Sequence, residues 1–243
     1  MDRNYVVCHI RRVLKNFIIL SVFVLMLTAC GNNKQNESAK GVISQKQSNT
    51  KSESNGNAQN SGGSNILIAY FTVPETDGTD TVSSASRVVT GDEVQGNTEF
   101  VAKEIQKNLG GDLFAIETVQ EYPGTHDELL DFAYKEKSDH ARPELATQID
   151  NLDNYEYIFV GYPNWNADLP MPVYSFFDTY DFSGKTIIPF VTHGGSGFSG
   201  TIQTIQKLEP EATVIEEGLS ISRNSVPNAQ DDIKKWTDSL LKD

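Results

Sequence analysis

Cysteine is nearly absent from this sequence of 243 residues, and the absence excludes several kinds of chemistry. The two cysteines, Cys8 and Cys30, both precede residue 65. Residues 65–243 therefore contain no disulfide, no thiol nucleophile and no cysteine-ligated metal site. His126 and His140 have the sequence context of exposed helix residues, and we find no cluster of side chains that predicts another kind of metal site.

Basic residues are scarce after residue 64. Residues 65–243 hold 12 Lys and Arg against 30 Asp and Glu, which gives them a formal net charge of −18, compared with −13 for the whole chain. A charge of this sign argues against binding to nucleic acid or to anionic lipid. It favours either a basic partner or simply a well-solvated surface.

Long apolar runs are also lacking, apart from residues 17–27. This run follows three basic residues between 11 and 15, is too short to span a bilayer comfortably and has the pattern of a secretory signal. It ends in Leu27-Thr28-Ala29-Cys30, which resembles the bacterial lipobox. We therefore predict a signal peptide over 1–29 and lipidation of Cys30, which would hold the protein on the extracytoplasmic face of the cell membrane. The alternative is an uncleaved signal anchor.

Apolar residues are almost missing from the next segment. Between Gly31 and Ser64 only Val42 and Ile43 are branched apolar residues, and Asn, Ser, Gln, Gly and Lys dominate. Such a composition cannot bury a core. We predict that residues 30–64 are the lipidated cysteine and a disordered linker, and that 65–243 form one domain.

Strand-like and helix-like segments alternate along residues 65–243. Nearly continuous apolar runs, typical of strands buried on both faces, occur at 65–72, 112–118, 157–162, 186–192 and 212–221. Amphipathic stretches between and after them predict helices at 98–109, 126–139, 171–180, 199–208 and 229–242. The alternation predicts an α/β fold with a doubly wound parallel sheet, in which ligands bind beyond the carboxyl ends of the strands.

The loop after the fourth predicted strand is rich in glycine. Within THGGSGFSG (192–200) the spacing matches G-x-G-x-x-G, but a dinucleotide fingerprint belongs to the first strand of its unit. Neither Ser196 nor Ser199 satisfies G-x-S-x-G, which argues against a hydrolase. Glycines here free the backbone to lie against a flat ligand, flanked by His193 and Phe198.

Two other loops reach the same predicted edge. After the first strand, Thr72 is followed by the insertion 73–95, in which we predict a hairpin turning at Gly91, and then by Gly96-Asn97-Thr98 at a helix start. Small residues before a helix suit phosphate binding, although Asn97 or Thr98 also suits a simple helix cap.

The loop after the third strand contains Trp165 in the sequence GYPNWNADLP. A large ring at this edge is suited to stacking on a flat heteroaromatic ligand. The alternative is that the ring folds back on its own loop or on Pro170 and Pro172.

Together, the strand ending in Tyr70-Phe71-Thr72, the Gly96-Asn97-Thr98 segment, the turn Gly161–Trp165 and the loop Thr192–Gly197 resemble the flavodoxins over about 66–242. The resemblance implies a three-layer sandwich with a five-stranded parallel sheet in the order 2-1-3-4-5, and noncovalent binding of FMN. It assigns the FMN phosphate to Thr72, Gly96, Asn97 and Thr98. It assigns the ring to two further groups, one on each side: Pro163, Asn164, Trp165 and Asn166, and His193, Gly194, Gly195, Ser196, Gly197 and Phe198.

The resemblance implies an electron-transfer flavoprotein tethered to the membrane, which would exchange electrons with a basic redox protein or a small redox molecule. Two alternatives stay open. The first is an FMN-dependent oxidoreductase that acts directly on a quinone or another small acceptor, with His193 as the candidate proton donor. The structural alternative for His193 is a side chain at a strand end that forms a hydrogen bond to a neighbouring loop. The second is a flavin-free binding lipoprotein on the same fold.

Overall fold

Six short strands form one parallel sheet in the computed structural model, which describes residues 65–76, 87–90 and 93–240. The strand order is β4-β1-β5-β6-β7, and β8 also pairs with β6. Residues 1–64, including Cys30, lie outside the described residues. The strands are β1 (Ile66–Tyr70), β4 (Asp112–Ala115), β5 (Tyr157–Pro163), β6 (Thr186–His193), β7 (Thr213–Val214) and β8 (Leu219–Ser222).

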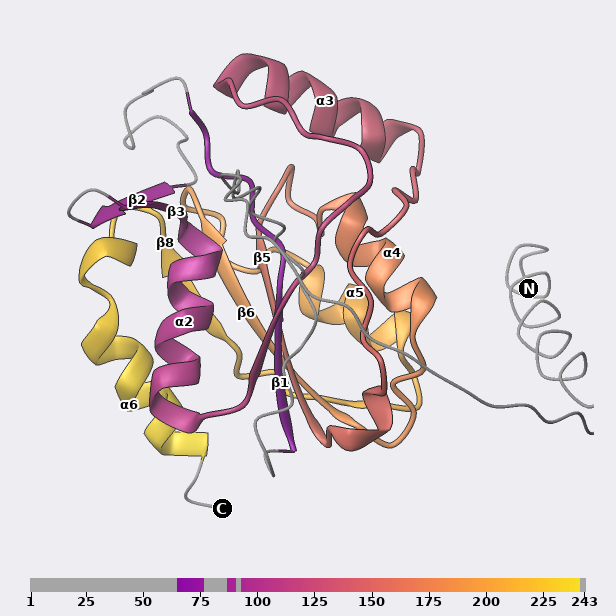
Figure 1. Ribbon diagram of the computed structural model, residues 1–243, viewed down its shortest axis with the longest axis vertical. Coiled ribbons are helices and arrows are strands. Elements are labelled where there is room, and N and C mark those ends of the chain that lie inside the picture. The colour runs from indigo at the N-terminus through magenta and orange to yellow at the C-terminus, as the bar shows by residue number, and fades with distance from the viewer. Residues whose placement is uncertain (1–64, 77–86, 91–92, 241–243) are drawn as a thin grey trace, which may run out of the picture. The chain divides into compact units, whose positions relative to one another are not determined.

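Helices cover both faces of the sheet, as Figure 1 shows. On one face lie α2 (Asn97–Leu109) and α6 (Gln230–Leu240), which pack against each other. On the other lie α4 (Met171–Thr179) and α5 (Thr201–Leu208). Two 3₁₀ turns, at Leu152–Asn154 and Val226–Asn228, complete the connections. The predicted α/β fold is therefore confirmed, with the order that corresponds to 2-1-3-4-5.

Each face of the sheet has its own apolar core. Under α2 and α6, Phe159 of β5 packs with Ile105 and Ile233. Under α4 and α5, Val160 of β5 packs with Phe176 and other aromatic side chains. Adjacent residues of β5 thus serve opposite cores, which is why this strand has a continuous apolar run rather than an alternating one. Each fully buried large side chain contributes about 1.5–3 kcal/mol through removal from water.

The fifth predicted strand, 212–221, is divided into β7 and β8, and this corrects the expectation of one continuous strand. The register passes from Ile187↔Val214 to Phe190↔Leu219, so the outer strand carries two extra residues opposite β6. Pro189 lies at the break and has no N–H to donate. The carbonyl oxygens of Lys185 and Ile187 accept hydrogen bonds from the backbone N–H groups of Thr213 and Ile215, on the β7 side. Alternate residues of a strand point to the same side, so the N–H group that Pro189 lacks would have pointed toward the outer strand as well.

The insertion after β1 contains the predicted hairpin. Strands β2 (Arg87–Thr90) and β3 (Glu93–Gly96) are antiparallel, and Thr90 pairs with Glu93 across a two-residue connection. The expected turn residue, Gly91, lies outside the described residues. Strand β3 leads directly into α2, so the hairpin returns the chain to the end of β1.

Helix α3 (His126–Ser138) does not belong to either core. Figure 1 shows it at the top of the view, beyond the carboxyl ends of the strands. Of the described helices, none has the length and apolar character needed to cross a membrane.

Gly161 is a position in β5 on which a side chain of the neighbouring strand packs directly. It pairs with Phe190 of β6, and a Cβ at Gly161 would lie 2.0 Å from Cζ of the fully buried Phe190 ring. We expect Gly161→Ala to lower the free energy of unfolding by about 1–3 kcal/mol, since the ring has no room to move. Denaturant titration measures this change.

Gly200→Ala is the control for that substitution. At this position φ is −111° and a Cβ would meet no atom within 4 Å, so we expect a change within about 0.5 kcal/mol. Equal stabilities of the two variants would contradict the packing of Phe190 on Gly161.

Candidate functional site

A cavity of about 250 Å³ lies at the carboxyl edge of the sheet. It extends from Asn97, the first residue of α2, past Thr192 at the end of β6 to the loops that follow β5 and β6. The three loops that the sequence singled out therefore contribute to one cavity. The lining residues from these loops are Asn97, Pro163, Asn164, Trp165, Asn166, Ala167, Thr192, His193, Gly194 and Ser196.

A larger cavity, of about 820 Å³, lies at the opposite edge of the sheet. It is lined by the first residues of strands, such as Tyr157 and Thr186, and by the last turns of α2 and α6. In parallel α/β sheets the ligand-binding loops gather at the carboxyl edge, so we place the functional site in the smaller cavity.

The start of α2 lies against the end of β1. A Cβ at Gly96 would be 1.9 Å from Oγ1 of Thr72, so only glycine admits this approach. The hairpin thus brings together the two halves of the predicted phosphate segment, which are more than 20 residues apart in sequence. Thr98 Oγ1 lies 2.9 Å from Thr192 Oγ1, which joins α2 to the end of β6.

Asn97 is the most informative residue at this helix start. It is only 2% exposed, it lines the cavity, and its Oδ1 accepts no hydrogen bond from the described residues. A buried carbonyl oxygen without a partner costs about 1–3 kcal/mol. The N–H groups of the first turn of α2 have no intrahelical acceptors either, and the helix dipole favours negative charge there. The helix N–H groups suit an anionic group, whereas the Asn97 oxygen suits a hydroxyl or N–H donor of the ligand.

The tryptophan turn (Trp165–Asp168) is a tight two-residue hairpin. Trp165 and Asp168 exchange backbone hydrogen bonds of 3.2 and 3.0 Å, and the two central residues, Asn166 and Ala167, have φ of 56° and 58°. Asn tolerates this left-handed region, whereas alanine there is strained by roughly 1 kcal/mol.

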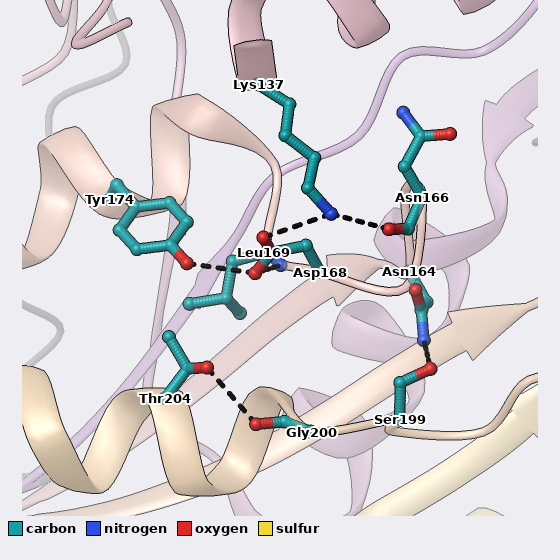
Figure 2. A network of polar contacts seen from close by, with 9 residues as sticks. All are labelled: Lys137, Asn164, Asn166, Asp168, Leu169, Tyr174, Ser199, Gly200 and Thr204. Atoms are coloured by element: carbon teal, nitrogen blue, oxygen red, sulfur yellow. Dashed lines mark hydrogen bonds and ion pairs between the residues drawn. The ribbon is translucent and has the colours of Figure 1, made fainter. Parts of the chain in front are cut away.

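Lys137 of α3 fastens the tryptophan turn, as Figure 2 shows. Its Nζ donates to the carbonyl oxygen of Asn166 at 2.7 Å and lies 3.2 Å from the carboxylate of Asp168. Asp168 also accepts from the hydroxyl of Tyr174 at 2.9 Å. The left-handed turn is therefore held from both sides.

Helix α3 forms the roof of the cavity. His126, Leu129, Leu130 and Ala133 line it, at the spacing of one helix face. The N-terminal end of α3 is attached to the chain after β1, because His126 Nδ1 lies 2.8 Å from Oε1 of the buried Glu75. The sequence predicted this helix but not its place, since its apolar face is as suited to a cavity as to a core.

The glycine loop (Gly194–Gly200) is tied to the loop after β5 through Asn164. Its Nδ2 donates to the carbonyl oxygen of Gly197 at 2.6 Å and to the hydroxyl of Ser199 at 3.0 Å. Oδ1 of Asn164 is buried and accepts no hydrogen bond from the described residues. Deeper in the protein, the Tyr162 hydroxyl donates to Thr201, whose own hydroxyl donates to Phe198 O.

His193 stabilises the first turn of the glycine loop. The Gly195 N–H donates to its Nδ1 at 2.9 Å, so the neutral imidazole carries its proton on Nε2. Partial burial lowers the pKa of His193, which favours this neutral form. This hydrogen bond lies within the loop that follows β6, and not to a neighbouring loop as the structural alternative for His193 expected; Nε2 is the atom left to carry a proton.

The Trp165 ring packs against two aromatic rings. It meets Phe71 edge-on at a centroid distance of 5.3 Å, and Tyr122 lies 5.9 Å away. The ring thus contacts the chain after β1 and the chain after β4, and it also lines the cavity. The partners Phe71 and Tyr122 are neither in the loop of Trp165 nor the prolines Pro170 and Pro172 that the alternative named, and the sequence did not indicate them.

Six of the predicted site residues do not line the cavity. Each supports a residue that does, through the Thr72–Gly96 approach, the Thr98–Thr192 contact or the turns of the glycine loop. They are Thr72, Gly96, Thr98, Gly195, Gly197 and Phe198. Among the described residues, no group of His, Cys, Asp and Glu is suited to a metal ion. The lining residues that the sequence gave no reason to select are Glu75, the α3 residues named above and Arg223 after β8.

Comparisons with known proteins agree with this architecture. A family model described as flavodoxin matches residues 87–240. A protein described as a flavoprotein from Bacteroides eggerthii superposes with a TM-score of 0.53 at 23% identity, covering 74% of this chain and 100% of that one. A flavoprotein from Lactobacillus acidophilus, solved in complex with FMN, has a TM-score of 0.49 at 19% identity, over 72% of this chain and 99% of that one. No curated protein matches the sequence.

Proposed function

Because this chain belongs to the flavodoxin family, we propose that it binds FMN noncovalently in the cavity at the carboxyl edge and transfers electrons outside the cytoplasmic membrane, to which Cys30 attaches it. The observation that carries the proposal is the meeting of Asn97, Trp165 and the glycine loop around one cavity. These residues come from three segments that are far apart in the sequence.

The chemistry of the lining fits FMN. The start of α2, with Asn97 and Thr98, suits the phosphate. The Oδ1 atoms of Asn97 and Asn164 are acceptors that the described residues leave unsatisfied, and FMN has hydroxyl and N–H donors. Trp165 and the glycine loop would hold the ring. When bound, FMN supplies the redox chemistry, and the protein supplies binding, orientation and electrostatics.

The net charge of the domain indicates which kind of partner it would bind. A domain with a formal net charge of −18 attracts a basic redox protein, and electrostatic attraction of this kind raises association rates. A small redox molecule is the other proposed partner. Membrane attachment through a lipid would confine either exchange to the membrane surface.

The second candidate is an FMN-dependent oxidoreductase that acts directly on a small acceptor such as a quinone. The apolar roof formed by Leu129, Leu130 and Ala133 favours it, because an apolar wall suits a flat apolar molecule. His193 Nε2 is the atom that would exchange the proton. Steady-state turnover with a nicotinamide or a quinol, in the absence of a protein partner, distinguishes this activity from protein-to-protein transfer.

The test of the proposed function is FMN uptake by the full-length protein. We expect a flavin absorption spectrum after purification or reconstitution, and stoichiometric quenching of FMN fluorescence during titration. A protein that circular dichroism shows to be folded but that leaves FMN fluorescence unchanged would contradict the proposal. The flavin-free binding lipoprotein would then be the better interpretation.

Asn97→Ala is expected to change ligand affinity and stability in different directions. We expect FMN to bind about tenfold more weakly, because a hydrogen bond to a charged or polar ligand group is lost. We expect the FMN-free protein to be at least as stable as the wild type, because a buried oxygen without a partner is removed. Fluorescence titration and thermal unfolding measure the two effects.

Asn108→Ala is the matched control, in the last turn of the same helix. Its Nδ2 is also buried without a hydrogen-bond partner among the described residues, but it lies about 16 Å along α2 from Asn97. FMN affinity should be unchanged. An equal loss of affinity in both variants would show that α2 stability, and not Asn97, determines binding.

A further inference from the structure

Arg223 is placed at the glycine loop by the pairing of β6 with β8. Ser222, the last residue of β8, pairs with His193, and the Arg223 N–H donates to the carbonyl oxygen of His193 at 2.8 Å. The backbone of Arg223 therefore lies beside the first residue of the loop. Its side chain lines the cavity together with Gly194 and Ser196.

Gly194 makes room for the Arg223 guanidinium. A Cβ at Gly194 would lie 3.3 Å from Nη1 of Arg223, which is closer than most side chains pack, and 3.5 Å from Cζ, which is an ordinary contact. Gly195 and Gly197 have φ of 138° and 58°, so the backbone conformation explains why these two residues are glycines. Gly194 does not have a positive φ, and its missing side chain instead admits the guanidinium against the loop backbone.

Arg223 is the one Lys or Arg among the described residues that line the cavity. Glu75 is the one lining carboxylate, and it contacts His126 of α3. The rest of the domain is strongly acidic. The charge of Arg223 thus opposes the general field of the protein at the glycine loop, which is proposed above to hold the ring.

We propose that Arg223 sets the reduction potential of the bound flavin, an inference that rests on the FMN site proposed above. When the ring accepts two electrons and one proton from a reduced donor, the proton goes to N5. The remaining negative charge is shared by N1 and the C2 carbonyl oxygen. A guanidinium in the cavity that holds the ring would stabilise this anion more than it stabilises the neutral oxidised ring. Arg223 therefore raises the potential of a flavin that the acidic domain would otherwise make harder to reduce.

The experiment measures the potential of the full-length, FMN-loaded protein by equilibration with a reference dye during reduction with dithionite. For Arg223→Gln we expect binding of the reduced form to weaken about tenfold relative to the oxidised form, which is about 30 mV toward negative potential for a two-electron couple. Arg223→Lys keeps the charge and should keep most of the potential. Lys107→Gln removes the same charge about 15 Å along α2 from Asn97 and should leave the potential unchanged.

Titration with oxidised FMN is done on the same variants. Normal affinity for oxidised FMN together with a lower potential in Arg223→Gln, restored by lysine, supports the inference. An unchanged potential in Arg223→Gln overturns it, and so do equal losses of affinity for the oxidised and reduced forms. If the wild-type protein takes up no FMN, the proposed function itself fails, and that outcome is seen before any variant is compared.

Discussion

A Trp165→Ala protein is expected to bind FMN about ten- to a hundredfold more weakly than the wild type. Stacking of a flat heteroaromatic on an aromatic side chain contributes about 1–3 kcal/mol, and each 1.4 kcal/mol is a factor of ten in affinity. Trp165 lines the cavity beside Pro163 and Asn164. Titration of FMN fluorescence gives the dissociation constants, because the ring is quenched when it stacks.

The control separates stacking from packing. In the structure the Trp165 ring also contacts Phe71 and Tyr122, so its removal leaves a gap between the chain after β1 and the chain after β4. Trp165→Phe retains an aromatic ring and should recover most of the affinity. Thermal unfolding of the FMN-free variants measures the packing loss alone. Wild-type affinity in Trp165→Ala would exclude a role for this ring in binding.

Cys30→Ala is expected to abolish lipid attachment completely. The sequence Leu27-Thr28-Ala29-Cys30 resembles a lipobox, in which the cysteine is the residue that receives the lipid. Without it, cells grown with labelled palmitate should incorporate no label into the protein. The signal segment should also stay uncleaved, which increases the mass seen in immunoblots.

Cys8→Ala is the matched control, because Cys8 is the only other cysteine in the chain. It lies within the predicted signal peptide, so its loss should leave labelling and cleavage unchanged. An unlabelled wild-type protein would favour the uncleaved signal anchor instead. Label that persists in Cys30→Ala would exclude this residue as the attachment site.

Local patterns in the sequence were sufficient to predict the alternation of strands and helices, whereas the strand order came from the resemblance to the flavodoxins. Continuous apolar runs located the strands of the parallel sheet, and amphipathic spacing located the helices, because both patterns depend on near neighbours. The hairpin β2–β3 was also predicted from a short run. The division of the outer strand was missed, since it depends on Pro189 in the neighbouring strand, across the sheet.

Residues that line the cavity were predicted from the sequence mainly where loops follow strands. Gly96-Asn97-Thr98, Trp165 and the glycine loop all stand at strand ends, where parallel topology places ligands. Arg223 follows a strand too, but its importance depends on the register of β8 with β6 and on the space at Gly194. The place of α3 over the cavity depends on distant contacts, such as Lys137 with Asn166, for which the sequence contains no local pattern.

The two hydrogen bonds that Asn164 donates to the glycine loop make two loops into one cooperative unit. Neither the turn after β5 nor the loop after β6 can open fully while Gly197 O and the Ser199 hydroxyl are held. Slow amide hydrogen exchange in both segments is then controlled by a single opening event. A ligand that binds to either loop therefore restrains the other loop too. The free energy needed to open both loops together then contributes to retention of the cofactor.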